Sequence, residues 1–448
     1  MTRSLPRRHG LWAALACVAG LGSACAAQPR VARSTEPVRA TARGAGPVIL
    51  HAPTGARYAE NATELAQLLQ DPAGPTEIWL RPRTYLGNFV VRRTLALHGE
   101  LGATLNGNGQ GTVLDLGADH IVIDNLLLEH SGQRHTAEDA GIKGKGLGIR
   151  ITHVRVRNTL FGITLGECPR CEIERSHVEG LGDDVELKGD GIKLWESDDA
   201  RVRNCVVEHV RDVVVWYSRR VMLESNTVSH SRYGTHFMYA HDSTVRDSHI
   251  VDNVVSIFVM YSSRLHVLHN VLAGARGAAG IGVGFKESDA VQVEDNWVVA
   301  NTTGIYLDGT PRSARQPVLF SGNVFALNDV AMRFHGVREA LTFSNNEFRQ
   351  NTVVADIEGG GDALGTTFIH NYFSDYVGYD LDNNGIGDVA YQVKRLSGEL
   401  LDEHPQLEFF QGTVAIGLID AIANAVPVFA SKLLLIDREP SVNLAQNP

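Results

Sequence analysis

Short stretches in the middle of this chain alternate between apolar and polar residues, and they recur at a nearly constant interval. Four of them, aligned on their closing small residue, begin at residues 192, 213, 235 and 257, so that successive starts lie 21 or 22 residues apart. A repeat of this length is typical of a solenoid, in which each repeat adds one coil to a stack. Because alternation with a period of two is typical of strands, we predict an all-β fold, a right-handed parallel β-helix.

The alternation also predicts which side chains face the interior of the solenoid. Two almost wholly apolar columns are expected to point inward: Ile192, Val213, Thr235, Ile257, Val283 and Ile305, and Leu194, Val215, Phe237, Val259, Phe285 and Leu307. Two further columns are expected to point outward: Lys193, Val214, His236, Phe258, Gly284 and Tyr306, and Trp195, Trp216, Met238, Met260, Lys286 and Asp308. Solvated positions are rarely this apolar, so these columns indicate a partner surface or binding groove, with Trp195 and Trp216 as partner-binding residues. The alternative is that a loop or the C-terminal tail covers this face.

A recurring asparagine supports the same register. The positions, each followed closely by an apolar residue, are Asn204, Asn226, Asn270, Asn296, Asn323, Asn346 and Asn371, with Ser248 filling one gap. Asparagine tolerates tight turns and can both donate and accept hydrogen bonds. We therefore predict an amide ladder at an inner corner of the coils, continued in earlier coils by Asn125, His153 and Ser176.

Residues 1–26 have the features of a secretory signal peptide: a basic start, the apolar run 11–21 and then small residues. The run is too short for a stable membrane span. Cleavage after Ala26 would release a soluble periplasmic protein, which is the interpretation we favour, and a lipid anchor on Cys25 is the alternative. Residues 27–47 are predicted to be a disordered linker, and residues 48–395 the β-helix.

Residues 396–448 are predicted to form a C-terminal, partly helical tail. A helix-like apolar pattern covers residues 407–426, and a second apolar run covers residues 428–436. The tail could cap the open end of the solenoid, which otherwise exposes unpaired strand edges. It could also dock onto a membrane-protein partner, and the two roles are compatible. The candidate partner-binding residues in the tail are Phe409, Phe410, Leu418 and Ile419.

Charge and cysteine content narrow the possibilities further. The net charge is −10 with an isoelectric point near 6.0 and no basic stripe, so nucleic acid is not an expected partner. Cys17 and Cys25 lie in the predicted signal peptide, which leaves Cys168, Cys171 and Cys205, an odd number. The Cys-x-x-Cys pair is a candidate for thiol-metal or redox chemistry. A local disulfide or two ordinary turn residues are the alternative.

The segment 380–388 resembles the first part of an EF-hand calcium loop. The expected Ca2+ ligands are the side chains of Asp380, Asp382, Asn384 and Asp388 and the backbone carbonyl of Ile386. The twelfth position is Tyr391 rather than glutamate, so a bidentate ligand would have to come from elsewhere. The alternative is a loop stabilised by turns in which Asp and Asn side chains accept backbone hydrogen bonds.

A second metal candidate lies on the outward columns. Met238 and Met260 are predicted neighbours on adjacent coils, ~4.8 Å apart, with His236 two residues before Met238 and His241 just past the turn. Thioether and imidazole groups suit Cu(I) and reject hard cations. The alternative is that the methionines serve as adaptable packing at an interface.

A third possibility is sugar chemistry, because β-helices can present paired carboxylates to polysaccharides as acid and base. Five acidic residues cluster around one coil: Asp183, Asp184, Asp190, Asp198 and Asp199. A polysaccharide lyase, an epimerase or a carbohydrate-binding β-helix is therefore the alternative function.

Several stretches of the chain resemble the NosD family of periplasmic β-helix proteins that mature nitrous oxide reductase. The most specific are His-Phe-Met-Tyr at 236–239 and Phe-Val-Met-Tyr at 258–261, together with residues 189–195, 215–218, 231–235 and 304–309. Residues 138–142, 372–382 and 427–437 are also similar to that family. The resemblance covers roughly residues 48–440.

This resemblance implies a non-catalytic role in supplying the copper–sulfide cluster of nitrous oxide reductase. It implies as partners an ABC-type permease and ATPase of the inner membrane and a copper-carrying lipoprotein, with Cu(I) held transiently. The face of Trp195, Trp216, Met238 and Met260 with His236 then becomes the candidate for copper transfer or docking. The Cys168–Cys171 pair and the insert at 179–188 depart from the family pattern.

Overall fold

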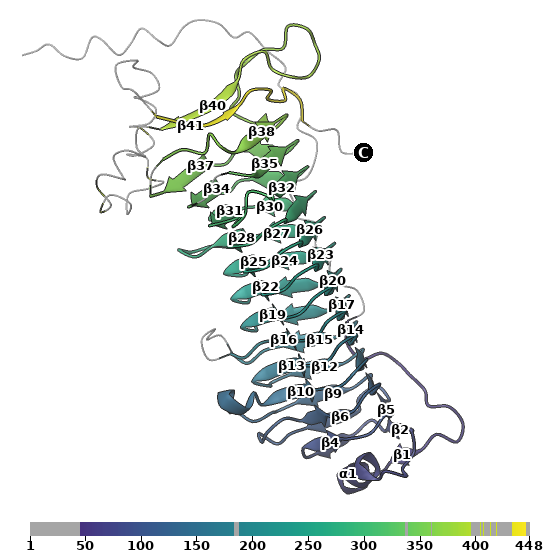
Figure 1. The fold of residues 1–448 in the computed structure, drawn as a ribbon. Helices are drawn as coiled ribbons and strands as arrows, with labels where there is room; N and C mark the ends of the chain where they lie inside the picture. Colours follow the sequence, from purple (N-terminus) through teal and green to yellow (C-terminus); the bar gives the residue numbers. More distant parts are fainter. Residues whose placement is uncertain are drawn as a thin grey trace, which may run out of the picture. The chain divides into compact units, whose positions relative to one another are not determined.

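The computed structural model describes residues 45–182, 188–336, 339–359, 361–395 and 432–444, and the single residues 404, 406, 413 and 418. Residues 183–187 and most of the segment 396–431 lie outside this description, and so does the predicted signal peptide. The part that is described forms a stack of β-coils running from residue 58 to residue 373 (Figure 1).

Each coil contributes one short strand to each of three parallel sheets. Sheet A contains β1 (Tyr58–Ala59), β2 (Glu77–Leu80), β5 (Ala96–Gly99), β8 (Val122–Asp124), β11 (Arg150–Thr152), β14 (Glu172–Glu174), β17 (Arg201–Arg203), β20 (Met222–Glu224), β23 (Thr244–Arg246), β26 (His266–Leu268), β29 (Gln292–Glu294), β32 (Val318–Ser321), β35 (Leu341–Ser344) and β38 (Thr367–Ile369). Sheet B contains β3 (Thr84–Leu86), β6 (Thr104–Asn106), β9 (Leu127–Glu129), β12 (Arg155–Arg157), β15 (His177–Glu179), β18 (Val206–Glu208), β21 (Thr227–Ser229), β24 (His249–Val251), β27 (Val271–Ala273), β30 (Trp297–Val299), β33 (Val324–Ala326), β36 (Glu347–Arg349) and β39 (Tyr372–Phe373). Sheet C contains β4 (Phe89–Val91), β7 (Leu114–Leu116), β10 (Ala140–Gly144), β13 (Phe161–Gly166), β16 (Ile192–Trp195), β19 (Asp212–Trp216), β22 (Tyr233–Met238), β25 (Val255–Met260), β28 (Ile281–Lys286), β31 (Thr303–Asp308), β34 (Val330–His335) and β37 (Val353–Glu358).

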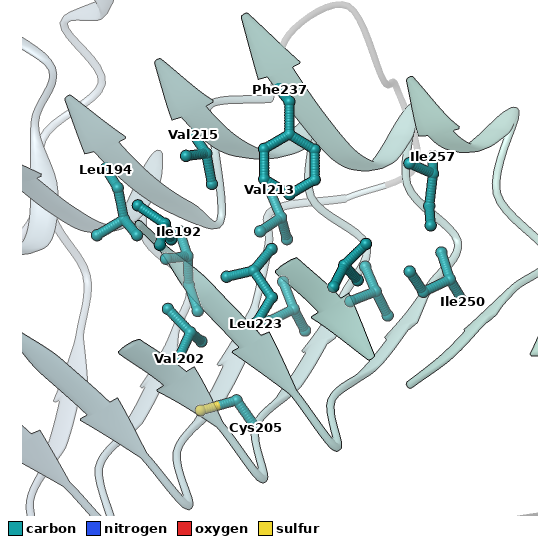
Figure 2. Packing of buried hydrophobic residues seen from close by; sticks show 14 of the residues in the cluster. Ile192, Leu194, Val202, Cys205, Val213, Val215, Leu223, Phe237, Ile250 and Ile257 are labelled. Carbon is teal, nitrogen blue, oxygen red and sulfur yellow. The ribbon is translucent and has the colours of Figure 1, made fainter. Parts of the chain in front are cut away.

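The predicted fold class, a parallel β-helix, is confirmed, and so is its register. In sheet C, Ile192 pairs with Val213 and Leu194 with Val215 on the neighbouring coil. Both predicted inward columns are buried and belong to one continuous apolar core, apart from the buried polar residue Thr235. Figure 2 shows side chains of both columns inside the coil, together with core side chains from strands of the other two sheets. Burial of these columns is the main favourable contribution to the stability of the fold.

The predicted amide ladder exists, but its first members differ from the prediction. Asn270, Asn296, Asn323, Asn346 and Asn371 are joined by side-chain hydrogen bonds of 2.9–3.0 Å between successive coils. Asn226 and Ser248 continue the column below them.

The assignments of Asn204, Asn125 and His153 to this ladder are wrong. These residues have positive φ angles of 55°, 61° and 50°, so they form the left-handed corner one position before the ladder. The inner position beside Asn204 belongs to Cys205, whose backbone N–H donates to the Asn226 side chain at 3.0 Å. A left-handed corner and an inner ladder both favour asparagine, so residue type alone does not separate the two positions.

A second amide ladder, which was not predicted, runs along another corner. Asn301, Asn328 and Asn351 are joined in the same way at 3.0–3.1 Å. These residues recur at the same interval as the first ladder, and that recurrence was the available sequence signal.

Helix α1 (Ala62–Gln70) packs against the first coils and was also not predicted. Asn61 caps it by accepting a hydrogen bond from the backbone of Glu64 at 2.9 Å, and Leu65 and Leu69 are buried. An Asn followed three residues later by Glu is a sequence signal for a helix start. Among the described residues, no helix is both long and apolar enough to cross a membrane.

Residues 432–444 close the other end of the stack. Strand β41 (Lys432–Asp437) pairs antiparallel with β40 (Tyr391–Arg395), and Leu434, Leu435 and Asp437 are buried. The Asp437 carboxylate accepts hydrogen bonds from the backbone and the side chain of Asn371, at 3.1 and 2.9 Å, and so ends the first ladder. This part of the tail therefore covers the last coil, and its role as a cap stays a prediction. The predicted helix at 407–426, with Phe409, Phe410 and Ile419, lies outside the described residues, and Leu418 is exposed.

Candidate functional site

Four adjacent strands of sheet C place the predicted outward side chains next to one another. Trp195 pairs with Trp216, Trp216 with Met238, and Met238 with Met260, on β16, β19, β22 and β25. All four side chains are half-buried. The register prediction for this face is therefore confirmed.

The neighbouring outward column is less exposed than predicted. Val214 is fully buried, and His236 and Phe258 are only 7% and 8% exposed. The large side chains of the face cover one another: the Phe258 ring lies so close to Gly284 that a Cβ there would be 2.4 Å from it. Tyr233 packs against both the His236 ring and the Phe258 ring. The face is thus a packed layer in which only part of each thioether and indole is exposed.

His236 and Met260 are brought together in the middle of this layer. His236 pairs with Phe258 in the strand register, but its ring points toward Met260, two residues further along the same strand. The imidazole Nε2 lies 3.3 Å from Met260 Sδ. Met238 pairs directly with Met260 on the neighbouring strand of sheet C, and neighbouring strands are ~4.8 Å apart. The structure therefore brings together three of the four predicted copper ligands.

Desolvation keeps the imidazole of His236 neutral. The ring packs edge-on against Trp216, with a centroid distance of 5.7 Å, and burial lowers the pKa of His236 to about 4. Neutral imidazole is the form that binds metal ions, so no proton has to leave near pH 7.

The fourth predicted ligand, His241, lies elsewhere. It follows the left-handed corner at Tyr239, and its Nδ1 lies 2.9 Å from Ser263 Oγ. Burial also lowers the pKa of His241. The structure does not bring it to the His236–Met260 pair.

A stack of tyrosines lies beside the thioethers and was not predicted as a site feature. Tyr217, Tyr239 and Tyr261 stack with successive ring centroids 5.1 Å apart. Tyr217 and Tyr239 are 48% and 41% exposed. Each follows directly after Trp216, Met238 or Met260, a recurrence that the sequence already contains. Together with the half-buried tryptophans they form a partly exposed aromatic margin of the face.

Near the start of the strands, two buried carboxylates pair with partly exposed arginines. The Arg211 Nε and Nη2 atoms donate to Asp190 Oδ1 at 3.0 and 2.8 Å, and Arg232 pairs with Asp212 on the next coil. Burial raises the pKa of Asp190 to about 6, the nearby Asp212 charge adds to this shift, and Arg211 opposes it. Arg220 binds both Asp198 and Asp199 at the surface. Of the five acidic residues considered for sugar chemistry, Asp190, Asp198 and Asp199 therefore form ion pairs with arginines. The other two, Asp183 and Asp184, lie outside the described residues.

The raised pKa of Asp190 predicts a pH dependence of stability. Since the folded state binds this proton more tightly than the unfolded chain, its contribution is complete below pH ~4 and is lost as the pH rises through 6. At about 1.4 kcal/mol per pKa unit, the contribution is at most about 3 kcal/mol. Urea unfolding at pH 4 to 7 should show wild type losing stability relative to Asp190→Asn, whose amide stays neutral. A difference that stays constant over this range would contradict the prediction.

The predicted calcium loop is folded on its own backbone. Asp380 accepts hydrogen bonds from the backbone N–H groups of Asn384 and Gly385 at 3.2 and 2.9 Å. Asp388 accepts from the Leu381 backbone at 2.7 Å. The backbone bonds of Asp380 lower its pKa against an opposing desolvation. This is the turn-stabilised alternative, and Ca2+ binding stays a prediction.

The Cys168–Cys171 pair is buried in a turn, with both thiols free. Cys168 occupies an inner position that serine holds in later coils, since its backbone N–H donates to Ser197 Oγ at 3.2 Å. The hydrogen bond between the two thiols, together with burial, raises the pKa of Cys171. Within the described ranges, no group of three or more His, Cys, Asp or Glu residues could hold a metal ion. The imidazole of His236 and the thioethers of Met238 and Met260 form a different kind of candidate, for a soft metal ion.

Fold and site together define the class: a parallel β-helix with two thioethers and an imidazole gathered on one outer face. A family model described as "Periplasmic copper-binding protein (NosD)" matches residues 176–378, a span that contains this whole face. The chain is 28% identical over 400 residues to the "Probable ABC transporter binding protein NosD" of Pseudomonas aeruginosa, covering 78% of this chain and 84% of that protein. It is 23% identical over 409 residues to the protein of the same description from Stutzerimonas stutzeri, covering 80% and 85%. Over these spans the chain is therefore similar to proteins of the NosD family.

Among solved structures, the A-module of the Azotobacter vinelandii mannuronan C-5 epimerase AlgE6 is similar, with a TM-score of 0.54. The sequence identity is 13%, and the match covers 68% of this chain and 94% of that module. This likeness concerns the β-helix fold alone.

Proposed function

We propose that this protein is a periplasmic accessory factor that carries Cu(I) during assembly of the copper–sulfide cluster of nitrous oxide reductase. Met238, Met260 and His236 bind the ion. The observation that supports this most directly is the 3.3 Å approach of His236 Nε2 to Met260 Sδ, with Met238 paired beside them. Two thioethers and a neutral imidazole form a soft ligand set that suits Cu(I).

The half-buried setting suits a carrier. The backbone pairing of sheet C holds the ligands in a rigid arrangement. Partial exposure of Met238 and Met260 leaves the ion accessible to a second protein. Complete burial would slow release. The protein thus holds copper as cargo and performs no catalysis.

The partners follow from the same face and from the relatives. Exposed Trp and Tyr side chains are enriched where proteins bind one another. Trp195, Trp216 and the tyrosine stack therefore form the docking margin for a copper-carrying lipoprotein and for the reductase. The descriptions of both relatives as ABC transporter binding proteins support an ABC-type permease and ATPase of the inner membrane as further partners.

A Cu(I) titration against a colourimetric chelator tests this proposal. Met238→Ala, Met260→Ala and His236→Ala should each weaken Cu(I) binding about tenfold or more, which is about 1.4 kcal/mol, and the double methionine variant should weaken it further. Met222→Ala is the matched control, because Met222 is a half-buried methionine on the outer face of sheet A. It should leave the affinity unchanged.

Equal Cu(I) affinities for wild type and the double methionine variant would contradict the proposal. If the protein instead cleaved or epimerised a uronate polymer, the alternative of a polysaccharide-active β-helix would replace it.

A further inference from the structure

Asp212 has a buried carboxylate that is held rigidly at the edge of the face formed by Trp195, Trp216, Met238 and Met260. It is 1% exposed. Its Oδ1 accepts from Arg232 Nε at 3.0 Å and from the Tyr233 backbone N–H at 3.2 Å, and its Oδ2 accepts from Arg232 Nη2 at 2.5 Å. These three hydrogen bonds leave the carboxylate little freedom to rotate.

A β-bulge brings His236 to this carboxylate. Asp212 pairs with Tyr233 and Val214 pairs with His236, so β22 contains one residue more than β19 between the two pairs. Bulges re-aim the side chains that follow them. The His236 Nδ1 atom lies 3.9 Å from Asp212 Oδ2, and it is buried without a hydrogen-bond partner. The opposite ring nitrogen, Nε2, faces Met260.

In a neutral imidazole, either Nδ1 or Nε2 carries the single N–H hydrogen, and the surroundings of the two atoms decide which tautomer is favoured. With the proton on Nδ1, the ring directs its N–H at a carboxylate, a charged and strong acceptor. With the proton on Nε2, it directs its N–H at a thioether, a weak acceptor. At 3.9 Å the Nδ1 atom forms no hydrogen bond, but the charge of the carboxylate attracts an Nδ1–H group more strongly than a thioether attracts an Nε2–H group, so the Nδ1–H tautomer is favoured. That tautomer leaves the Nε2 lone pair pointing at the thioethers.

We propose that Asp212, anchored by Arg232, is a positioning residue that selects the Nδ1–H tautomer of His236 and so presents Nε2 to the metal. A carboxylate that orients a metal-binding histidine typically changes metal affinity by 10–100-fold. The effect on copper affinity rests on the proposed function, whereas the tautomer is a property of the metal-free protein.

The preceding coil offers a matched control. Asp190 is also 1% exposed and pairs with an arginine, Arg211, through its Oδ1 atom. No contact joins Asp190 to the His236 ring among the described residues, so Asp190→Asn changes an equivalent carboxylate without touching the imidazole.

The test is long-range proton–nitrogen NMR of the metal-free protein with labelled histidine, with His236 assigned through His236→Gln. Wild type and Asp190→Asn should show the Nδ1–H tautomer. Asp212→Asn should shift His236 toward Nε2–H, because an amide oxygen is a weaker acceptor, and should weaken Cu(I) binding 10–100-fold.

A wild-type His236 protonated on Nε2 would overturn the proposal, and this result does not depend on any variant folding. An unchanged tautomer in Asp212→Asn would also overturn it. If wild type bound no Cu(I) while the tautomers behaved as expected, the copper function would fail and the positioning role of Asp212 would stand.

Discussion

Asn346→Leu is expected to lower the free energy of unfolding by about 4 kcal/mol or more. Asn346 is fully buried, accepts hydrogen bonds from the backbone and side chain of Asn323, and donates to Phe320 O and Asn371 Oδ1. Leucine is similar in volume, so the loss comes from the polar groups left without partners. Each such buried group costs about 1–3 kcal/mol. Urea unfolding followed by circular dichroism measures the difference.

The adjacent residue provides the control. Asn345 is exposed, with φ at 54°, a conformation that glycine adopts without strain. Asn345→Gly should therefore change the unfolding free energy by less than about 0.5 kcal/mol. Equal losses for the two variants would show that the ladder is not a specific source of stability.

Deletion of residues 432–444 is expected to destabilise the last coils by about 5 kcal/mol. Leu434 and Leu435 are buried, and burying a leucine contributes about 1.5–3 kcal/mol. Asn371 would also lose the Asp437 carboxylate that ends the ladder, and β40 would lose its partner strand. Differential scanning calorimetry should show unfolding that begins at a lower temperature than in the full chain.

A chain that ends at residue 444 is the control, because it keeps every described residue of the cap. It should melt as the full chain does. If the deletion of 432–444 left the transition unchanged, the capping role of this segment would be refuted, and docking onto a membrane partner would be its remaining predicted role.

Much of the architecture was predictable because it is repetitive. The spacing of 21 or 22 residues between the repeats, and the alternation within them, correctly assigned the inward columns and the pairing of Trp216, Met238 and Met260. The ligand prediction was less complete. His236 and Met260 meet as expected, but His241 turns away at the Tyr239 corner, where the alternation that defines facing no longer applies.

The sequence by itself determined the β-helix, the facing of its columns and the row of Trp and Met side chains on one face, because these follow from a period of two inside a period of about 22 residues. Only the tertiary structure decided which residue of each corner enters the ladder, as with Cys205 in place of Asn204. It also decided that His236 is buried, and that Asp212 lies beside its Nδ1. The burial of His236 and its position beside Asp212 depend on a one-residue bulge and on the packing of large side chains across coils. The bulge and this packing are not periodic along the chain, so the repeat does not predict them.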